Sequence, residues 1–259
     1  MDPRLAAFER LLTIMDELRE QCPWDKKQTL ESLRTLTIEE TYELADAILD
    51  RDDQQIASEL GDLFLHLVFY SKIGSERGTF DVTSVLNGVC EKLIHRHPHI
   101  YGDVQVKDEE EVKANWEKLK LKEGKRSVLE GVPKSLPALV KANRIQDKVK
   151  GIGFDWDEVG QVWDKLDEEI GELREAFERK GKDETELEFG DVLFSLVNIS
   201  RYLDVNPENA LERTNQKFIK RFMRMEELCS EQDLKLSEMK LEEMDRYWEQ
   251  AKLELREKD

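Results

Sequence analysis

Apolar residues recur every three or four positions along almost the whole chain, whereas strand-like alternation of apolar and polar residues is nearly absent. This period matches the 3.6 residues of an α-helical turn, so each segment presents one apolar face. Clear examples are Leu5, Phe8, Leu11, Met15 and Leu18 near the start, and Leu166, Ile170, Leu173 and Phe177 later in the chain. The pattern predicts an all-α protein.

Several short motifs predict where these helices begin. The stretch from Thr37 to Glu40 has the spacing of a capping box, and Asn206 followed by Pro207 places an N-cap before a proline at the first helical position. Phe154 and Trp156 precede a later helical segment and are expected to act as hydrophobic staples. We therefore expect helices to start after Thr37 and after Asn206.

Five short features occur twice, in the same order, which indicates a tandem duplication. Their offsets along the chain run from 125 to 132 residues. The pairs are Trp24-Asp25 with Trp156-Asp157, Glu39-Glu40-x-x-Glu43 with Glu168-Glu169-x-x-Glu172, Glu59-x-x-Asp62 with Glu188-x-x-Asp191, Lys92-x-x-x-Arg96 with Lys217-x-x-x-Arg221, and Trp116-x-x-x-Lys120 with Trp248-x-x-x-Lys252.

A basic segment rich in glycine and proline separates the two copies and breaks the helical rhythm. We therefore predict a first helical domain over residues 1–122, a linker over 123–137 and a second helical domain over 138–259. Each domain is expected to be a small helical bundle with its own core.

The repeated acidic residues form pairs spaced three apart, which places both members of a pair on one helix face. In the second copy Glu169 pairs with Glu172, and Glu188 pairs with Asp191. Because only a short turn separates the two segments, we expect antiparallel helices whose carboxylates converge. All-oxygen, acidic ligation is the chemistry that Mg²⁺ or Mn²⁺ prefers.

In a chain with 58 acidic residues, many such pairs only mark a solvated helix face. Glu188 and Asp191 differ because they stand in a helix whose other positions are mostly apolar, together with Ser195 and Asn198. Charges in such a setting are costly unless they are paired or bind a metal. A buried polar network is the alternative interpretation. A redox di-iron centre is disfavoured, because no histidine follows a glutamate by three positions.

Composition limits the partners. The formal net charge of −18 disfavours polymeric nucleic acid and anionic lipid, whereas a nucleotide could bind through divalent cations. Cys22, Cys90 and Cys229 show neither disulfide nor zinc-ligand spacing. No apolar run has the length of a signal peptide or a membrane helix, so we expect a cytoplasmic protein without membrane partners.

Taken together, the acidic motifs, the opening Cys22-Pro23-Trp24-Asp25 and the tract from Arg96 to His99 resemble the MazG family. That family is a two-domain branch of the all-α nucleoside triphosphate pyrophosphatases, and the resemblance spans nearly the whole chain. It implies a homodimer that uses Mg²⁺ to hydrolyse nucleoside triphosphates to monophosphates and pyrophosphate.

The resemblance also assigns residues by position. It implies catalytic and metal-binding roles for Glu169, Glu172, Glu188 and Asp191, and metal binding by Glu168 and by the first-copy residues Glu39, Glu40, Glu43, Glu59 and Asp62. Lys217, Arg221 and Lys252 are candidate phosphate contacts, Trp248 a candidate for base stacking, and Asn198 and Asn215 candidates for reading base or sugar.

The first copy has Phe69 and Cys90 where the second has Asn198 and Asn215, so we expect the second copy to be the catalytic one. Two other functions stay open. One is a phosphoribosyl-ATP or deoxyuridine triphosphate pyrophosphohydrolase, and the other is a non-catalytic helical adaptor that binds a basic protein partner through its acidic faces.

Overall fold

The computed structural model describes residues 2–108, 111–112, 115–116, 119, 127–179 and 181–256. Every regular element among these residues is a helix, which confirms the all-α prediction. The chain forms two compact units, Met1–Gln105 and Val106–Asp259, called the first and second unit below. The predicted domain boundary at residue 122 lies outside the described residues and stays a prediction. Within the described part of the chain, no helix is long and apolar enough to span a membrane.

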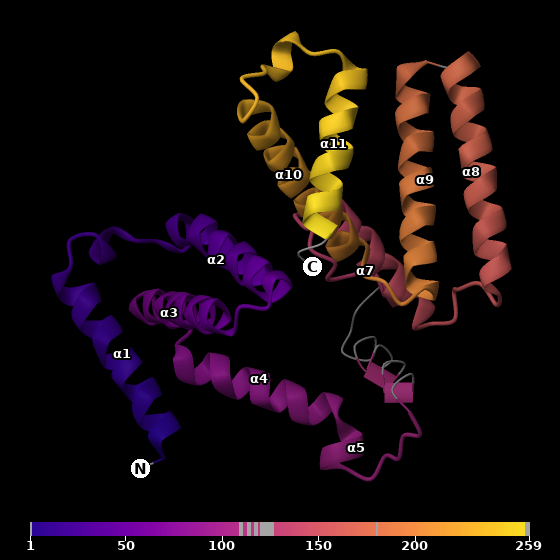
Figure 1. Cartoon of the computed structure of the whole chain (residues 1–259). Coiled ribbons are helices and arrows are strands. Elements are labelled where there is room, and N and C mark those ends of the chain that lie inside the picture. Colours follow the sequence, from indigo (N-terminus) through magenta and orange to yellow (C-terminus); the bar gives the residue numbers. More distant parts are fainter. Residues whose placement is uncertain are drawn as a thin grey trace. The chain divides into compact units, whose positions relative to one another are not determined.

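The first unit is built around a helical hairpin (Figure 1). Helix α3 packs against α2, α1 and α4. Its elements are α1 (Pro3–Gln21), the 3-10 helix η1 (Asp25–Lys27), α2 (Leu30–Asp50), α3 (Asp53–Glu76), α4 (Val82–Arg96) and α5 (Pro98–Tyr101).

The core of this unit lies where α1, α2 and α3 meet. Met15, Leu33, Val68, Phe69 and Ile73 form one cluster of buried apolar side chains. Since burying a large apolar side chain stabilises a fold by about 1.5–3 kcal/mol, this cluster stabilises the packing of α1, α2 and α3.

Helix α2 begins earlier than the sequence pattern predicted. Its N-cap is Thr29, whose side chain accepts a hydrogen bond from the backbone of Ser32, and Ser32 returns the bond. Thr37 lies inside the helix, and its hydroxyl donates to the Leu33 carbonyl. The predicted start after Thr37 was therefore wrong, because a stronger reciprocal cap stands eight residues upstream.

The second unit contains a matching helical hairpin, α8 with α9, and a second antiparallel pair, α10 with α11 (Figure 1). Helix α7 packs against both α9 and α10. The elements are α7 (Ala138–Lys150), α8 (Val159–Arg179), α9 (Lys182–Tyr202), α10 (Pro207–Ser230), the 3-10 helix η2 (Leu236–Glu238) and α11 (Leu241–Arg256).

Two separate apolar clusters hold this unit together. Val162, Leu166 and Ile199 are buried between α8 and α9, and Met225, Leu228, Cys229 and Ala251 are buried between α10 and α11. The predicted N-cap at Asn206 is confirmed, because its side chain accepts from the backbone of Asn209. Two such hairpins leave much apolar surface on their outer faces.

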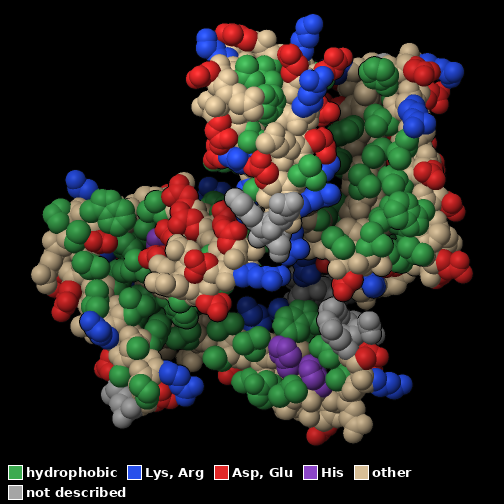
Figure 2. Space-filling view, in the orientation of Figure 1, with side chains coloured by type: hydrophobic (Ala, Val, Ile, Leu, Met, Phe, Trp, Pro, Cys, Tyr) green, Lys and Arg blue, Asp and Glu red, His purple; other side chains and the backbone are tan. Residues whose placement is uncertain are grey.

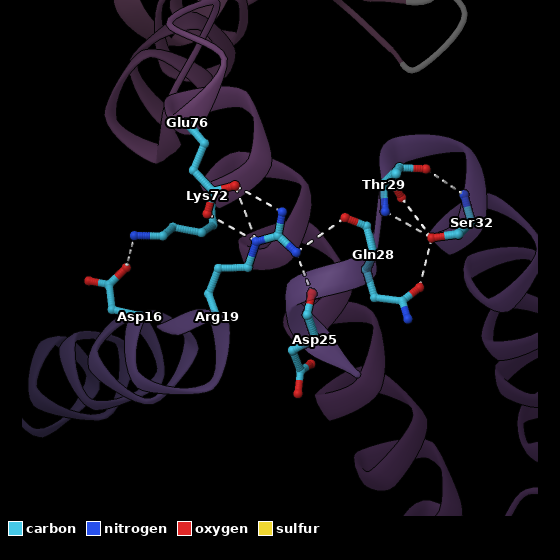
Figure 3. A network of polar contacts seen from close by, with 8 residues as sticks. All are labelled: Asp16, Arg19, Asp25, Gln28, Thr29, Ser32, Lys72 and Glu76. Atoms are coloured by element: carbon cyan, nitrogen blue, oxygen red, sulfur yellow. Dashed lines mark hydrogen bonds and ion pairs between the residues drawn. The ribbon is translucent and has the colours of Figure 1, made fainter. Parts of the chain in front are cut away.

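Arg19 ties the end of α1 to α3 and to the loop that precedes α2 (Figure 3). Its guanidinium donates to the Glu76 carboxylate at 2.9 Å, to the Gln28 carbonyl at 3.2 Å and to the Asp25 carbonyl. It also lies over the Phe69 ring, 5.6 Å from the centroid. Because its side chain is only 13% exposed, these contacts fix how the loop meets the core.

We expect Arg19→Met to destabilise the first unit by about 2 kcal/mol, because two partly buried carbonyls and one carboxylate lose their donor. The measurement is the midpoint of urea unfolding. Arg4→Met is the matched control, since Arg4 pairs with its near neighbour Asp2 and its side chain is 89% exposed, and should change the stability by less than ~0.5 kcal/mol. Equal effects of the two substitutions would contradict this role of Arg19.

Candidate metal centre

Carboxylates from both helices of the second hairpin converge on one point. Glu169 and Glu172 extend from α8 and Glu188 from α9, and each offers an oxygen within 4.8 Å of the others. Glu169 is 6% exposed, although it is charged and stands next to the apolar Leu166 cluster in sequence. The predicted convergence of the two carboxylate pairs is thus observed for three of the four residues, with Asp191 outside the group.

The remaining members of the predicted set lie at the edge of this cluster. Asp191 is exposed, one helical turn beyond Glu188, and Glu168 is exposed on the neighbouring position of α8. Neither belongs to the group within 4.8 Å. Both have a carboxylate within a turn of the centre, so they remain predicted ligands.

Lys165 forms ion pairs with the acidic residues of α8. Its Nζ lies 2.7 Å from Glu169 and 2.8 Å from Glu168. These two hydrogen bonds raise the pKa of the lysine, which therefore stays charged. Sequence analysis did not identify it, although a lysine one turn before two adjacent glutamates is a recognisable pairing signal. The equivalent first-unit position, three residues before Glu39, is Leu36.

The first hairpin contains the same arrangement. Glu40 and Glu43 from α2 and Glu59 from α3 also have oxygens within 4.8 Å of one another. Glu59 is 3% exposed and accepts a short hydrogen bond from Gln55. Glu39 is exposed and Asp62 half-buried, and both stand outside the group, as Glu168 and Asp191 do in the second unit.

The electrostatics of the first cluster indicate uncompensated negative charge. Burial, and then the charges of Asp62 and Glu43, raise the pKa of Glu40. His66, at the position equivalent to Ser195, is buried, and burial lowers its pKa, so it does not supply a balancing cation at neutral pH. In this cluster the like charges are relieved only by protonation or by an added cation.

Both clusters fit a divalent cation. The donors are carboxylate oxygens from two facing helices, and one glutamate in each cluster is more than nine-tenths buried. A merely solvated acidic face would leave those two glutamates exposed. Oxygen-only ligation favours Mg²⁺, Mn²⁺ or Ca²⁺ over zinc or copper.

The predicted phosphate and nucleotide contacts lie on α9, α10 and α11. Lys217 is exposed and Arg221 half-buried, one turn apart on α10, and Lys252 pairs with Glu249 on α11 at 2.9 Å. The Trp248 ring lies 5.0 Å from that of Phe218 and packs on the α10–α11 core. Trp248 therefore has a packing role in addition to any contact with a base.

The two asparagines differ in how firmly they are held. Asn215 is exposed and donates to Glu212 at 3.3 Å, whereas the Asn198 oxygen accepts from Arg201 at 2.9 Å. Arg201 was missed by sequence analysis.

The predicted staples were wrong, since Phe154 is 75% and Trp156 is 43% exposed, so neither is packed away as a staple requires.

We expect Lys165→Met to tighten Mn²⁺ binding about five-fold, because it removes a cation that competes for Glu168 and Glu169, an effect of roughly 1 kcal/mol. Electron paramagnetic resonance titration of free Mn²⁺ measures this. Lys182→Met, on an exposed lysine at the start of α9 nearly two turns before Glu188, is the control and should leave the affinity unchanged. Weaker Mn²⁺ binding by the Lys165 variant would show that the lysine supports the site.

Comparisons with known proteins agree with the repeated architecture. The model of the MazG nucleotide pyrophosphohydrolase domain matches twice, over residues 28–101 and 160–224, and each match contains one carboxylate cluster. The chain is 46% identical over 250 residues to the nucleoside triphosphate pyrophosphohydrolase/pyrophosphatase MazG of Thermotoga maritima, covering 95% of both chains. It is 40% identical over 254 residues to the nucleoside triphosphate pyrophosphohydrolase of Escherichia coli K12, covering 95% of this chain and 97% of that one.

Proposed function

Because the chain belongs to the MazG nucleotide pyrophosphohydrolase family, we propose that it hydrolyses nucleoside triphosphates to monophosphates and pyrophosphate at the α8–α9 cluster. The observation that carries this proposal is the convergence of Glu169, Glu172 and Glu188 within 4.8 Å, with Glu169 buried. This donor set suits a divalent cation, and a triphosphate needs such cations to approach an acidic protein.

The metal and the side chains have separate roles in the proposed hydrolysis. Glu169, Glu172, Glu188 and Asp191 would hold a Mg²⁺ or Mn²⁺ ion, and Glu168 lies close enough to share in this role. A metal bound there would neutralise phosphate charge and lower the pKa of a bound water toward neutral. One of the α8 glutamates, Glu169 or Glu172, also serves as general base for the attacking water.

Cationic side chains on α10 and α11 complete the site. Lys217 and Arg221 share one face of α10, as residues four apart do, and together form a clamp for phosphate oxygens that the metal does not reach. Lys252 contributes a third positive charge from α11. Trp248, Asn198 and Asn215 contact the nucleoside.

The two units do not share this chemistry equally. Where the second unit has Asn198, the first has Phe69, which is 2% exposed and belongs to the core. A core phenylalanine cannot hydrogen-bond a nucleotide. We therefore assign catalysis to the second unit and metal binding without turnover to Glu39, Glu40, Glu43, Glu59 and Asp62. The substrates belong to the nucleotide pool of the cytoplasm, where we place the enzyme.

We further propose that the chain acts as a homodimer through the outer face of α8 and α9. Figure 2 shows hydrophobic side chains gathered over these helices. Phe189, Leu193 and Leu196 share one face of α9 and are 39–54% exposed. Apolar patches of this kind on a monomer are costly in water and mark interfaces.

Pyrophosphate release from a panel of eight nucleoside and deoxynucleoside triphosphates with Mg²⁺ tests the activity. The double substitution Glu188→Gln with Asp191→Asn should reduce kcat by at least about a hundred-fold, because it removes two metal ligands. The matched first-unit pair, Glu59→Gln with Asp62→Asn, should retain kcat within about two-fold. Absence of pyrophosphate release from every nucleotide would contradict the proposal. Equal losses of kcat in the two double variants would refute the assignment of catalysis to the second unit.

We expect Leu196→Asp to convert the dimer into a monomer, because it places a charge within the apolar face of α9. Light scattering coupled to size-exclusion chromatography gives the mass directly. Leu5→Asp, on a 63% exposed leucine of α1, should leave the dimer intact. A wild-type protein of 30.4 kDa in solution would contradict the dimer.

A further inference from the structure

Arg201, at the end of α9, is the most heavily engaged buried cation near the proposed nucleotide site. Its side chain is 8% exposed. It donates to Asp155 at 2.6 Å and to the Asn198 side-chain oxygen at 2.9 Å, and its Nε lies 3.6 Å from Asp147. These partners come from α7, from the loop before α8 and from α9 itself.

The contact with Asn198 fixes the direction of an amide. A guanidinium has only donors, so it can face only the oxygen of the asparagine side chain. The Asn198 NH₂ group is then directed away from Arg201, and the half-buried residue offers a donor to a neighbouring group. A free asparagine amide could rotate and present either atom, whereas this one cannot.

The position of Asn198 suits the nucleoside end of a substrate. It follows Glu188 by ten residues and Asp191 by seven on the same helix, which places it about 10–15 Å further along the axis at 1.5 Å per residue. A triphosphate held at the carboxylates would extend over a comparable length before its sugar and base. An oriented donor at that point meets an acceptor oxygen, either a sugar hydroxyl or a base carbonyl.

The first unit provides an internal comparison. Lys72 occupies the position equivalent to Arg201, because it follows Glu59 by thirteen residues as Arg201 follows Glu188. Lys72 pairs with Asp16 on α1 at 2.6 Å (Figure 3). Arg201 retains the corresponding contact with Asp147 on α7. Its contacts with Asp155 and Asn198 have no equivalent, because Pro23 and Phe69 stand at those positions.

Tyr202 reinforces the same junction. Its hydroxyl lies 3.2 Å from the Asp155 carboxylate and 2.7 Å from the Trp156 carbonyl, both within donor range. The loop before α8 is thus fixed to the end of α9 by two consecutive residues. This arrangement keeps Asp155 in place as the second acceptor for Arg201, so the guanidinium cannot turn away from Asn198.

We propose that Arg201 is a positioning residue that determines nucleotide selectivity by holding the Asn198 amide with its NH₂ group toward an acceptor oxygen of the nucleoside. The inference rests on the proposed function. It extends that function by assigning nucleotide selectivity to an acceptor oxygen of the nucleoside and to the buried arginine that orients the donor toward it.

The test is steady-state kinetics of the full-length protein with ribo- and deoxyribonucleoside triphosphates of all four bases. Arg201→Lys keeps the charge but loses the planar fork, so it should raise KM for the preferred nucleotide about five- to ten-fold while kcat changes less than about two-fold. Asn198→Asp replaces the donor with an acceptor and should reverse the preference. Lys72→Met is the matched control and should leave the nucleotide ranking unchanged.

The panel distinguishes the two acceptors. If the acceptor is the base carbonyl O6 of guanine or O4 of uracil and thymine, Asn198→Asp shifts the preference toward adenine and cytosine nucleotides, which carry an amino group there. If it is the sugar hydroxyl, the ribose-to-deoxyribose ratio changes equally for every base. Mn²⁺ affinity, measured in parallel, should stay unchanged in both variants, which separates this role from an effect on the metal centre.

Two outcomes overturn the proposal. One is an unaltered nucleotide ranking in both Arg201→Lys and Asn198→Asp, and the other is a uniform fall in kcat for all nucleotides with unchanged KM, as a purely structural role would give. If Arg201→Lys fails to fold, Asn198→Asp decides alone, because an aspartate at this position still accepts a hydrogen bond from Arg201. Lack of turnover by the wild type contradicts the proposed function instead, and does so before any variant is compared.

Discussion

Like charges held close together inside an apolar helical hairpin are the constraint on which this structure depends. In each unit three glutamates from facing helices approach within 4.8 Å, and one of them is more than nine-tenths buried. Such carboxylates repel one another and lose hydration, and a fold keeps them only if protons, paired cations or metal ions balance the charge. The hairpins α2–α3 and α8–α9 supply the rigid backbone that keeps these side chains together despite their repulsion.

The two units meet this constraint in different ways. In the second unit Lys165 lies against Glu168 and Glu169, and Arg201 connects the end of α9 to the loop before α8. In the first unit the equivalent positions are Leu36 and Lys72, and Phe69 joins the core under Arg19. The duplicated chain has thus retained its acidic geometry twice while the polar residues around it diverged. We propose that this divergence, more than the carboxylates themselves, distinguishes the two units in function.

The sequence was sufficient to predict the helical class, the duplication and the convergence of the glutamates, because these follow from periodicity and repeated spacing. The N-terminus of α2 was mispredicted because two caps compete, and the reciprocal Thr29–Ser32 cap prevails over the weaker Thr37 pattern. Phe154 and Trp156 were expected to pack inward but are exposed, since the loop is fixed by Asp155 and Tyr202 instead. Arg201 could not be identified from one sequence, because its partners lie 46 and 54 residues away or one turn back on its own helix, and only the fold brings them together.

The central claim is that the clustered carboxylates of each hairpin are cation ligands. Anomalous diffraction from crystals of the full-length protein grown with Mn²⁺ tests it directly. The account predicts a peak bonded to oxygens of Glu169, Glu172 and Glu188, and a second peak among Glu40, Glu43 and Glu59 in the first unit. Well-ordered carboxylates at both places, hydrogen-bonded to one another or to Lys165 with no anomalous peak between them, would contradict it.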